Sequence, residues 1–196
     1  GAGKTTLAQI LSKELGFHLF EEQVNENKLL PLYYEDPKRW ALHSQIFYLK
    51  EKVGQLTQIK KLLRSSSVVQ DTPIYQDCFT YAKAQYLLNY MTKDEYDLYL
   101  KLFEAYHQSL PKPSLIIQLE TSVPTLQTII KKRARDFEKS IESSYLKLLS
   151  KLQKEWIREH KKLKIMEVKT NNYQFDFSNA IYKNALVEKI KSALEA

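Results

Sequence analysis

The chain has 196 residues, which is long enough to bury one sizeable core, so we expect a single domain over residues 1–196. No apolar run approaches the roughly 20 residues of a membrane span, and a single cysteine, Cys78, excludes an internal disulfide and suits a reducing cytoplasm. The net charge is +7, but the lysines alternate with acidic or apolar residues, as on solvated helix faces. No groove-reading or base-stacking module accompanies this charge, so we expect neither nucleic acid nor membrane as a partner.

The first residues, GAGKTT, hold the second half of the phosphate-binding signature G-x-x-x-x-G-K-[ST]. In that loop, backbone N–H groups cradle phosphates, the lysine reaches the outer phosphates, and the hydroxyl contacts Mg²⁺. Gly3, Lys4 and Thr5 supply these groups. An apolar face begins at Leu7, and Gly16 is placed to end the helix. At this point a chance match at a helix N-terminus remains the alternative.

Strand and helix patterns alternate along the rest of the chain. In the first half of the chain we expect a strand at 17–23, a long helix opened by Asp36-Pro37, a short strand within 65–71, and helices from Ile74 to Tyr90 and from Asp94 to His107. In the second half we expect a strand at 114–120, a helix from Pro124 to the basic run at 131–139, a helix from Ile141 to His160, a strand at 164–168, and a last helix to Ala196. This alternation predicts an α/β fold with a parallel sheet flanked by helices.

The phosphate-binding loop normally follows a strand, and no such strand precedes Gly1 in this sequence. With that strand the sheet has five strands. Without it, two strand edges are exposed inside the core, where their backbone groups have no partners. We therefore expect that the sequence is truncated at its N-terminus and lacks the first strand of the domain.

Polar residues gather where the expected strands end. Glu21 and Glu22 end one strand, and Asp71 ends the next. The run KKRARDFEK (131–139) holds five cations in nine residues. Because ligands bind beyond the carboxyl ends of parallel strands, such a run can form a short arginine lid over phosphates. Its alternative is a helix C-terminus with cations placed against the helix dipole.

Four stretches resemble one known family: EEQVNENKLLPLYYEDPKRW, PKPSLIIQLETSVPTL, KKRARDFEKSIESSYLKLL and TNNYQFDF. They are similar to the bacterial deoxyribonucleoside kinases, in the order and spacing of that family and over essentially the whole chain. The resemblance implies a P-loop kinase fold and transfer of the terminal phosphate of ATP to the 5′-hydroxyl of a deoxyribonucleoside, with Mg²⁺ as the metal. It also implies a purine acceptor, deoxyadenosine or deoxyguanosine, and a homodimer.

The resemblance further implies roles for individual residues. The donor phosphates would lie on the loop formed by Gly1, Ala2, Gly3, Lys4, Thr5 and Thr6, with Mg²⁺ on Thr5 and Asp71. Glu22 would be the base that takes the 5′-hydroxyl proton, and Arg133 and Arg135 would be the lid arginines that clamp the donor. The sugar would contact Tyr34 and Glu138, and the base would be selected by Gln45, Lys52 and Asp77.

Two of these assignments have structural alternatives. Asp77 could be an exposed helix acid, and Trp40 and Phe47 could either line the base pocket or pack in the core.

The chain also departs from the family pattern. Many members carry an arginine after the acid at Asp71, where this chain has Thr72, and the other departures are Gln23, Ile129 and Ala134. Lys83 and Arg39 are candidates to replace the missing cation.

These departures keep two further functions open. One is a catalytically impaired nucleotide-binding subunit or regulator of the same fold. The other is a different small P-loop kinase, acting on thymidylate or shikimate. The set of Tyr34, Gln45 and Asp77 suits a neutral nucleoside better than an anionic acceptor. The sequence therefore favours a deoxynucleoside kinase.

Overall fold

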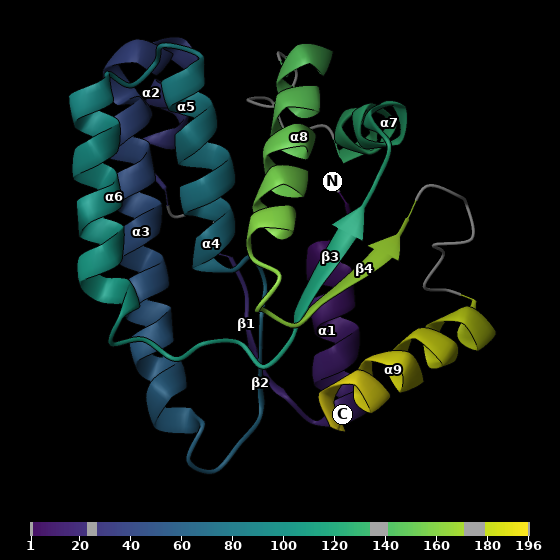
Figure 1. Ribbon diagram of the computed structural model, residues 1–196. Coiled ribbons are helices and arrows are strands. Elements are labelled where there is room, and N and C mark those ends of the chain that lie inside the picture. Colours follow the sequence, from purple (N-terminus) through teal and green to yellow (C-terminus); the bar gives the residue numbers. More distant parts are fainter. Residues whose placement is uncertain (1, 23–26, 134–140, 171–178, 196) are drawn as a thin grey trace.

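The computed structural model describes residues 2–22, 27–133, 141–170 and 179–195, without the side chain of Arg133 (Figure 1). Its elements, in chain order, are α1 (Lys4–Leu15), β1 (His18–Phe20), α2 (Leu30–Glu35), α3 (Pro37–Leu62), β2 (Val68–Gln70), α4 (Ile74–Gln76), the π-helical segment η2 (Asp77–Ala82), α5 (Lys83–Leu87), α6 (Lys93–His107), β3 (Ile116–Glu120), α7 (Val123–Arg133), α8 (Ser143–Glu159), β4 (Ile165–Lys169) and α9 (Ala180–Glu195).

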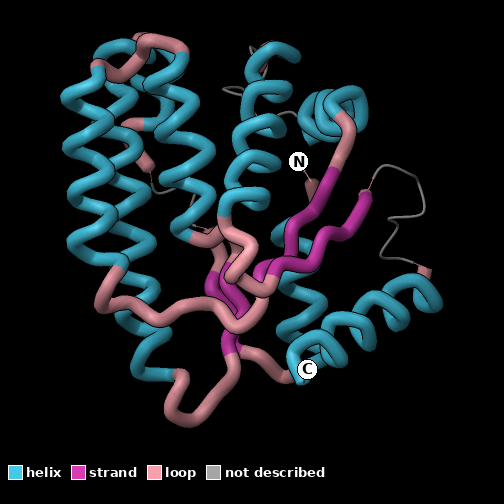
Figure 2. The backbone as a smooth tube through the Cα atoms, in the orientation of Figure 1, coloured by secondary structure: helices cyan, strands magenta, loops and turns pink. Residues whose placement is uncertain are grey.

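The described strands are parallel and form two pairs, in agreement with the expected α/β architecture (Figure 2). β1 pairs with β2, with His18 opposite Val68, and β3 pairs with β4, with Ile116 opposite Ile165. A cavity of about 460 Å³, lined by residues of both β2 and β3, lies between the pairs. The described residues therefore supply four strands, and the expected count of five is not confirmed.

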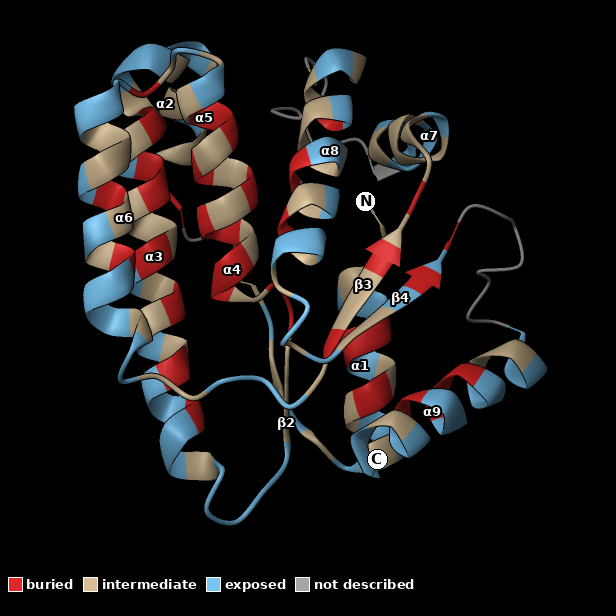
Figure 3. Ribbon diagram, viewed as in Figure 1, coloured by how far each residue is buried: buried red, intermediate tan, exposed pale blue. Residues whose placement is uncertain are grey.

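Helices cover the strands on two sides, with one hydrophobic core on each (Figure 3). The larger core joins α3, α4, η2, α6 and α8 to Ile116 of β3. The smaller core joins α1 and α9 to Leu119 of β3 and Val168 of β4. Ile116 and Leu119 reach opposite cores because they are an odd number of residues apart, and side chains alternate along a strand.

The long helix α3 starts where the sequence predicts. The Asp36 carboxylate accepts a hydrogen bond from the Arg39 backbone N–H at 3.2 Å, and Pro37 occupies the first turn. Gln45 and Lys52, seven residues apart, both belong to its buried face. The helix therefore carries two polar side chains toward the interior among its aliphatic residues.

Two local features differ from the expectation. Residues 30–35 form the helix α2 where the sequence suggests a loop, because Pro31 is compatible with a first turn. The helix expected from Ile74 to Tyr90 changes its hydrogen-bond pattern to π-helical over Asp77–Ala82. Such wider turns occur frequently at functional sites. No helix in the described part of the chain is long and apolar enough to cross a membrane.

Candidate active site

A cavity of about 290 Å³ is lined by residues of α1, α2, α3, η2, β3, α7 and α8, and by Glu22, which follows β1. Its lining includes Lys4, Glu22, Tyr34, Gln45 and Asp77, which come from five separate segments of the chain. The cavity between β2 and β3 is larger but mostly apolar in its lining. A ligand site combines an apolar wall with a few converging polar groups, so the smaller cavity is the candidate active site.

The half-signature at the N-terminus forms the start of α1. Gly3 has φ +87°, a left-handed conformation that glycine adopts without strain, and Lys4 is the first helical residue. Ala2 and Lys4 line the cavity, so the N-terminus of a twelve-residue helix faces it. Free N–H groups and the helix dipole at this end favour an anion. Gly1 lies outside the described residues.

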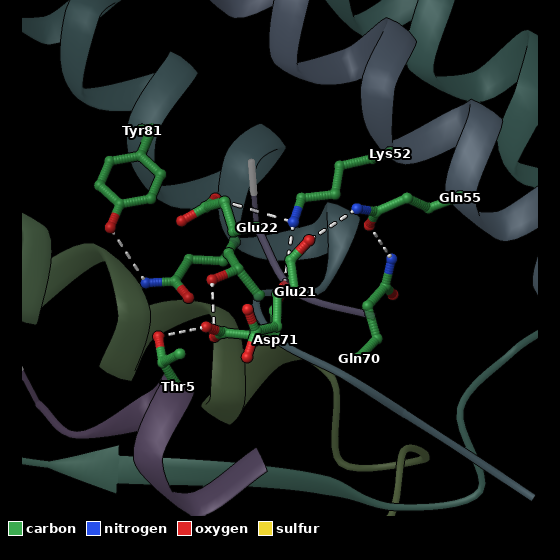
Figure 4. A network of polar contacts seen from close by, with 10 residues as sticks. Thr5, Glu21, Glu22, Lys52, Gln55, Gln70, Asp71 and Tyr81 are labelled. Carbon is green, nitrogen blue, oxygen red and sulfur yellow. Dashed lines mark hydrogen bonds and ion pairs between the residues drawn. The ribbon is translucent and has the colours of Figure 1, made fainter. Parts of the chain in front are cut away.

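Thr5 and Asp71 meet beside this helix start. The Thr5 hydroxyl donates to Asp71 Oδ2 at 2.5 Å (Figure 4), and the Asp71 backbone N–H donates to the Phe20 carbonyl at 2.8 Å. Asp71 is 4% exposed. Thr72 follows with φ +62°, a region that β-branched residues rarely adopt, and its hydroxyl lies 3.3 Å from Asp71 Oδ1. A carboxylate is thereby fixed next to the loop hydroxyl.

Glu22 follows β1 and lines the cavity, with a quarter of its side chain exposed. Lys52 of α3 approaches it, with Nζ 3.7 Å from Glu22 Oε1 (Figure 4). The same ammonium donates to the Asp71 carbonyl oxygen at 3.1 Å. Lys52 is not among the residues that line the cavity within the described ranges. Glu22 therefore borders the cavity, and Lys52 lies behind it.

Gln45 and Asp77, which also line the cavity, are buried, 6% and 2% exposed. Gln45 Oε1 and Asp77 Oδ2 have no hydrogen-bond partner among the described residues. The pKa of the Asp77 carboxyl is raised to about 7, mainly because burial disfavours its charged form; Glu22 also raises it, whereas Lys52 and Lys4 lower it. Asp77 is thus not an exposed helix acid. It is a buried carboxyl able to accept or donate near neutral pH.

The structure adds polar residues that the sequence analysis missed. Tyr33, Tyr48, Tyr81, Gln85 and Tyr145 line the cavity. The Tyr33 hydroxyl donates to Gln85 Oε1 at 2.9 Å, and Gln85 Nε2 donates to the Tyr145 hydroxyl at 3.3 Å. Burial raises the pKa of Tyr48 to about 12, so this phenol stays neutral. Helical spacing gave a signal for two of them, since Tyr48 follows Gln45 by three residues and Tyr81 follows Asp77 by four.

The remaining expected site residues divide into three groups. Tyr34 lines the cavity, next to Tyr33. Trp40 and Phe47 do not line it, and Trp40 instead contacts Arg39 and His43. Lys83 and Arg39, the candidate replacement cations, are absent from the described lining as well. The side chain of Arg133, together with Arg135 and Glu138, lies outside the described residues.

Comparison with known proteins finds one family over almost the whole chain. The family model for "Deoxynucleoside kinase" matches residues 1–195. The chain is 36% identical to deoxyguanosine kinase of Bacillus subtilis (strain 168) over 151 residues, covering 76% of this chain and 70% of that protein. It is 30% identical to deoxyadenosine/deoxycytidine kinase of the same organism over 196 residues, covering 99% of this chain and 89% of that protein. The structure of deoxyadenosine kinase from M. mycoides with bound dCTP superimposes with a TM-score of 0.83 at 26% identity, covering 98% of this chain and 95% of that one.

Proposed function

Because the chain belongs to the deoxynucleoside kinase family, and so is an ATP-dependent kinase of deoxynucleosides, we propose that the cavity beside α1 is where its acceptor binds. One observation carries this proposal. Lys4, Glu22, Tyr34, Gln45 and Asp77 line a single cavity although they are scattered over the first half of the chain. Lys4 marks the phosphate end of the cavity, and the two buried polar groups mark the base end.

Glu22 is the base in this proposal. The 5′-oxygen attacks the γ-phosphorus of ATP, and the bond from that phosphorus to the β–γ bridging oxygen breaks. Glu22 takes the proton of the 5′-hydroxyl, and ADP leaves with the electron pair of the broken bond. A carboxylate that lines the same cavity as Lys4, Gln45 and Asp77 supports this assignment. Lys4 and the N–H groups at the start of α1 stabilise the transferring phosphates.

The base end of the cavity supports a purine acceptor. Gln45 can donate and accept at once through its amide, and its buried Oε1 has no partner among the described side chains. Asp77 offers a second buried oxygen beside it. Each is paired when a base with complementary edge groups is bound. The names of the relatives, a deoxyguanosine kinase and a deoxyadenosine/deoxycytidine kinase, agree with a purine preference.

Mg²⁺ fits the phosphate end of the site. Thr5 and Asp71 present a hydroxyl and a carboxylate 2.5 Å apart, and Mg²⁺ prefers such hard oxygen ligands, usually one or two carboxylates together with phosphates. When bound, the ion neutralises charge on the phosphate oxygens. Thr5 and Asp71 are the residues that would hold it.

Three features of the proposal extend beyond the described residues. Arg133 and Arg135 would clamp the donor phosphates from the lid, and Glu138 would contact the sugar with Tyr34.

A homodimer is proposed from the likeness of the sequence to the family, and size-exclusion chromatography with light scattering tests it. A cytoplasmic location is proposed because the single cysteine suits a reducing compartment.

The test is Glu22→Gln, which keeps the size of the side chain and removes its basicity. We expect turnover with ATP and Mg²⁺ to fall by about 100- to 10,000-fold, the usual contribution of a general base, while deoxynucleoside affinity by calorimetry changes little. Glu21→Gln is the matched control, because Glu21 is exposed, outside the cavity lining, and bonded to Gln9 Nε2 at 2.7 Å. A Glu22→Gln enzyme with near-parent turnover shows that the base is wrongly assigned.

The parent protein must be assayed with each of the four deoxynucleosides. Formation of a purine deoxynucleoside monophosphate at the highest kcat/KM is the expected result. ATP binding without product from any of them supports the impaired-subunit alternative. Product from an already phosphorylated acceptor alone supports a thymidylate kinase.

A further inference from the structure

Lys52 is a buried cation in the middle of α3, with 2% of its surface exposed. A buried ammonium is costly unless it is paired and hydrogen-bonded. Residues of aliphatic character occupy most of the same helix face, so the position could hold a leucine as easily. The contacts of the Lys52 Nζ atom therefore indicate the role of its charge.

The ammonium joins the ends of two neighbouring strands. It donates to the carbonyl oxygen of Asp71, which follows β2, at 3.1 Å. It also lies 3.7 Å from Oε1 of Glu22, which follows β1 (Figure 4). The first contact fixes the position of Nζ against backbone. The second holds the Glu22 carboxylate by its charge.

The charges around Lys52 come from the acids of the cavity. Besides Glu22, it acts on Asp77, whose pKa it lowers. Thr72, the residue after Asp71, is neutral and 2% exposed. Among the ion pairs of the described residues, Lys52 is the cation that contacts Glu22. It reaches that carboxylate from a position that is not part of the cavity lining in the described ranges.

We propose that Lys52 is a positioning residue that holds Glu22 in the orientation needed to take the acceptor proton. The proposal rests on Glu22 being the base, as proposed above. A glutamate side chain has several rotatable bonds, and a catalytic group displaced by about 1 Å can lose on the order of 100-fold in rate. Lys52 limits that freedom by tying the carboxylate to the backbone of the adjacent strand.

The experiment compares Lys52→Met, Lys52→Arg and Glu22→Gln with the combined variant Glu22→Gln/Lys52→Met. For Lys52→Met we expect kcat to fall by about 100-fold, with the dissociation constants of deoxyadenosine and deoxyguanosine unchanged within about threefold. Lys52→Arg keeps the charge and is expected to recover most of kcat. The combined variant is expected to be no slower than Glu22→Gln, because Lys52 acts through the carboxylate.

Four results overturn the proposal. One is a Lys52→Met enzyme that keeps kcat but changes the ratio of deoxyadenosine to deoxyguanosine KM, which makes Lys52 a base reader. Another is a combined variant whose loss is the product of the single losses. If Glu22→Gln is nearly fully active, the base assignment and the Lys52 proposal both fail. If Glu22→Gln is inactive while Lys52→Met is active, the Lys52 proposal alone fails.

Folding of Lys52→Met is checked by the binding measurement, which needs an intact cavity. Lys52→Gln serves as a second neutral variant, since its amide can still donate a hydrogen bond. If both neutral variants fail to fold, Lys52→Arg decides the matter. A large loss of kcat for that variant, with deoxynucleoside affinity retained, agrees with positioning, and a changed preference among deoxynucleosides at parent kcat contradicts it.

Discussion

The two ends of the cavity are built differently. Beside the proposed phosphate end, the polar groups already contact one another: Thr5 donates to Asp71, and Lys52 donates to the Asp71 carbonyl and forms an ion pair with Glu22 at 3.7 Å. At the base end, Gln45 Oε1 and Asp77 Oδ2 are buried without partners among the described residues. One end is assembled in the absence of a ligand, whereas the other leaves hydrogen-bonding capacity for one.

This difference follows from what each end must do. Groups that act on a transferring phosphoryl group need fixed geometry, because reorganisation during the reaction raises the barrier. Groups that select a base discriminate better between bases when they are already buried away from water. A base with the wrong hydrogen-bonding edge then leaves them unpaired. We therefore expect substitutions at the phosphate end to affect kcat, and those at the base end to affect stability and affinity.

The largest of these effects is expected for Thr5→Val, which keeps the shape of the side chain and removes the hydroxyl bonded to Asp71. By analogy with the loss of one transition-state donor, kcat should fall by about 100- to 1,000-fold. Deoxynucleoside affinity should stay near that of the parent, because the base end is untouched. Thr5→Ser is the matched control and should retain most of the activity. Comparable kcat values for the valine and serine variants would contradict a preassembled phosphate end.

A smaller effect, on stability, is expected at the base end. The pKa of Asp77 is raised to about 7 in the folded protein, so between its unfolded value near 4 and pH 7 the folded state binds more protons than the unfolded state. The free energy of unfolding must then decrease as pH rises through this interval and level off above it. From pH 5 to pH 8 the decrease is roughly 2–3 kcal/mol, at about 1.4 kcal/mol per pKa unit.

Asp77→Asn removes this titration. Urea unfolding at pH 5 and pH 8 should therefore show this decrease in the free energy of unfolding in the parent protein and not in the variant. The exposed Asp94 provides the control, and Asp94→Asn should follow the parent curve. Equal pH dependence in the parent and Asp77→Asn would show that Asp77 has an ordinary carboxyl pKa in the folded protein.

The smallest effect is expected at the tyrosine side of the cavity. Gln85→Leu removes the hydrogen bonds that join Tyr33 and Tyr145 through the amide. The loss is about 1 kcal/mol, which corresponds to roughly a fivefold rise in KM for the deoxynucleoside. kcat should be maintained, because Gln85 has no contact with the phosphate end. Gln58→Leu, on the exposed face of α3, is the control and should leave both parameters unchanged.

The family and the α/β architecture were predictable from the sequence, because the relevant signals are local. The start of α3 depends on Asp36 and Pro37, which act within one helical turn. The end of α1 depends on Gly16, whose φ is +68°. Gln45 and Lys52 were expected on one helix face from their separation, and both are buried there. Periodicity and capping residues carry this information without knowledge of distant contacts.

Other features depended on contacts between segments distant in sequence. The partner of Thr5 is 66 residues away, and Gln85 meets Tyr145 across 60. The sequence left open whether Trp40 and Phe47 line the base pocket or pack in the core, and the packing shows that neither is part of the described cavity lining. The contacts of the Lys52 ammonium with Glu22 and with the Asp71 carbonyl oxygen, 30 and 19 residues away along the chain, could likewise not be derived from local pattern.

The sequence by itself thus determined most of the helices and strands and the family they make, because capping and periodicity act over a few residues. Only the tertiary structure decided which polar groups are paired and which are left buried without partners. That outcome depends on burial and on distances of a few ångströms between residues far apart in the chain. It is this pairing that separates a phosphate end from a base end in one cavity.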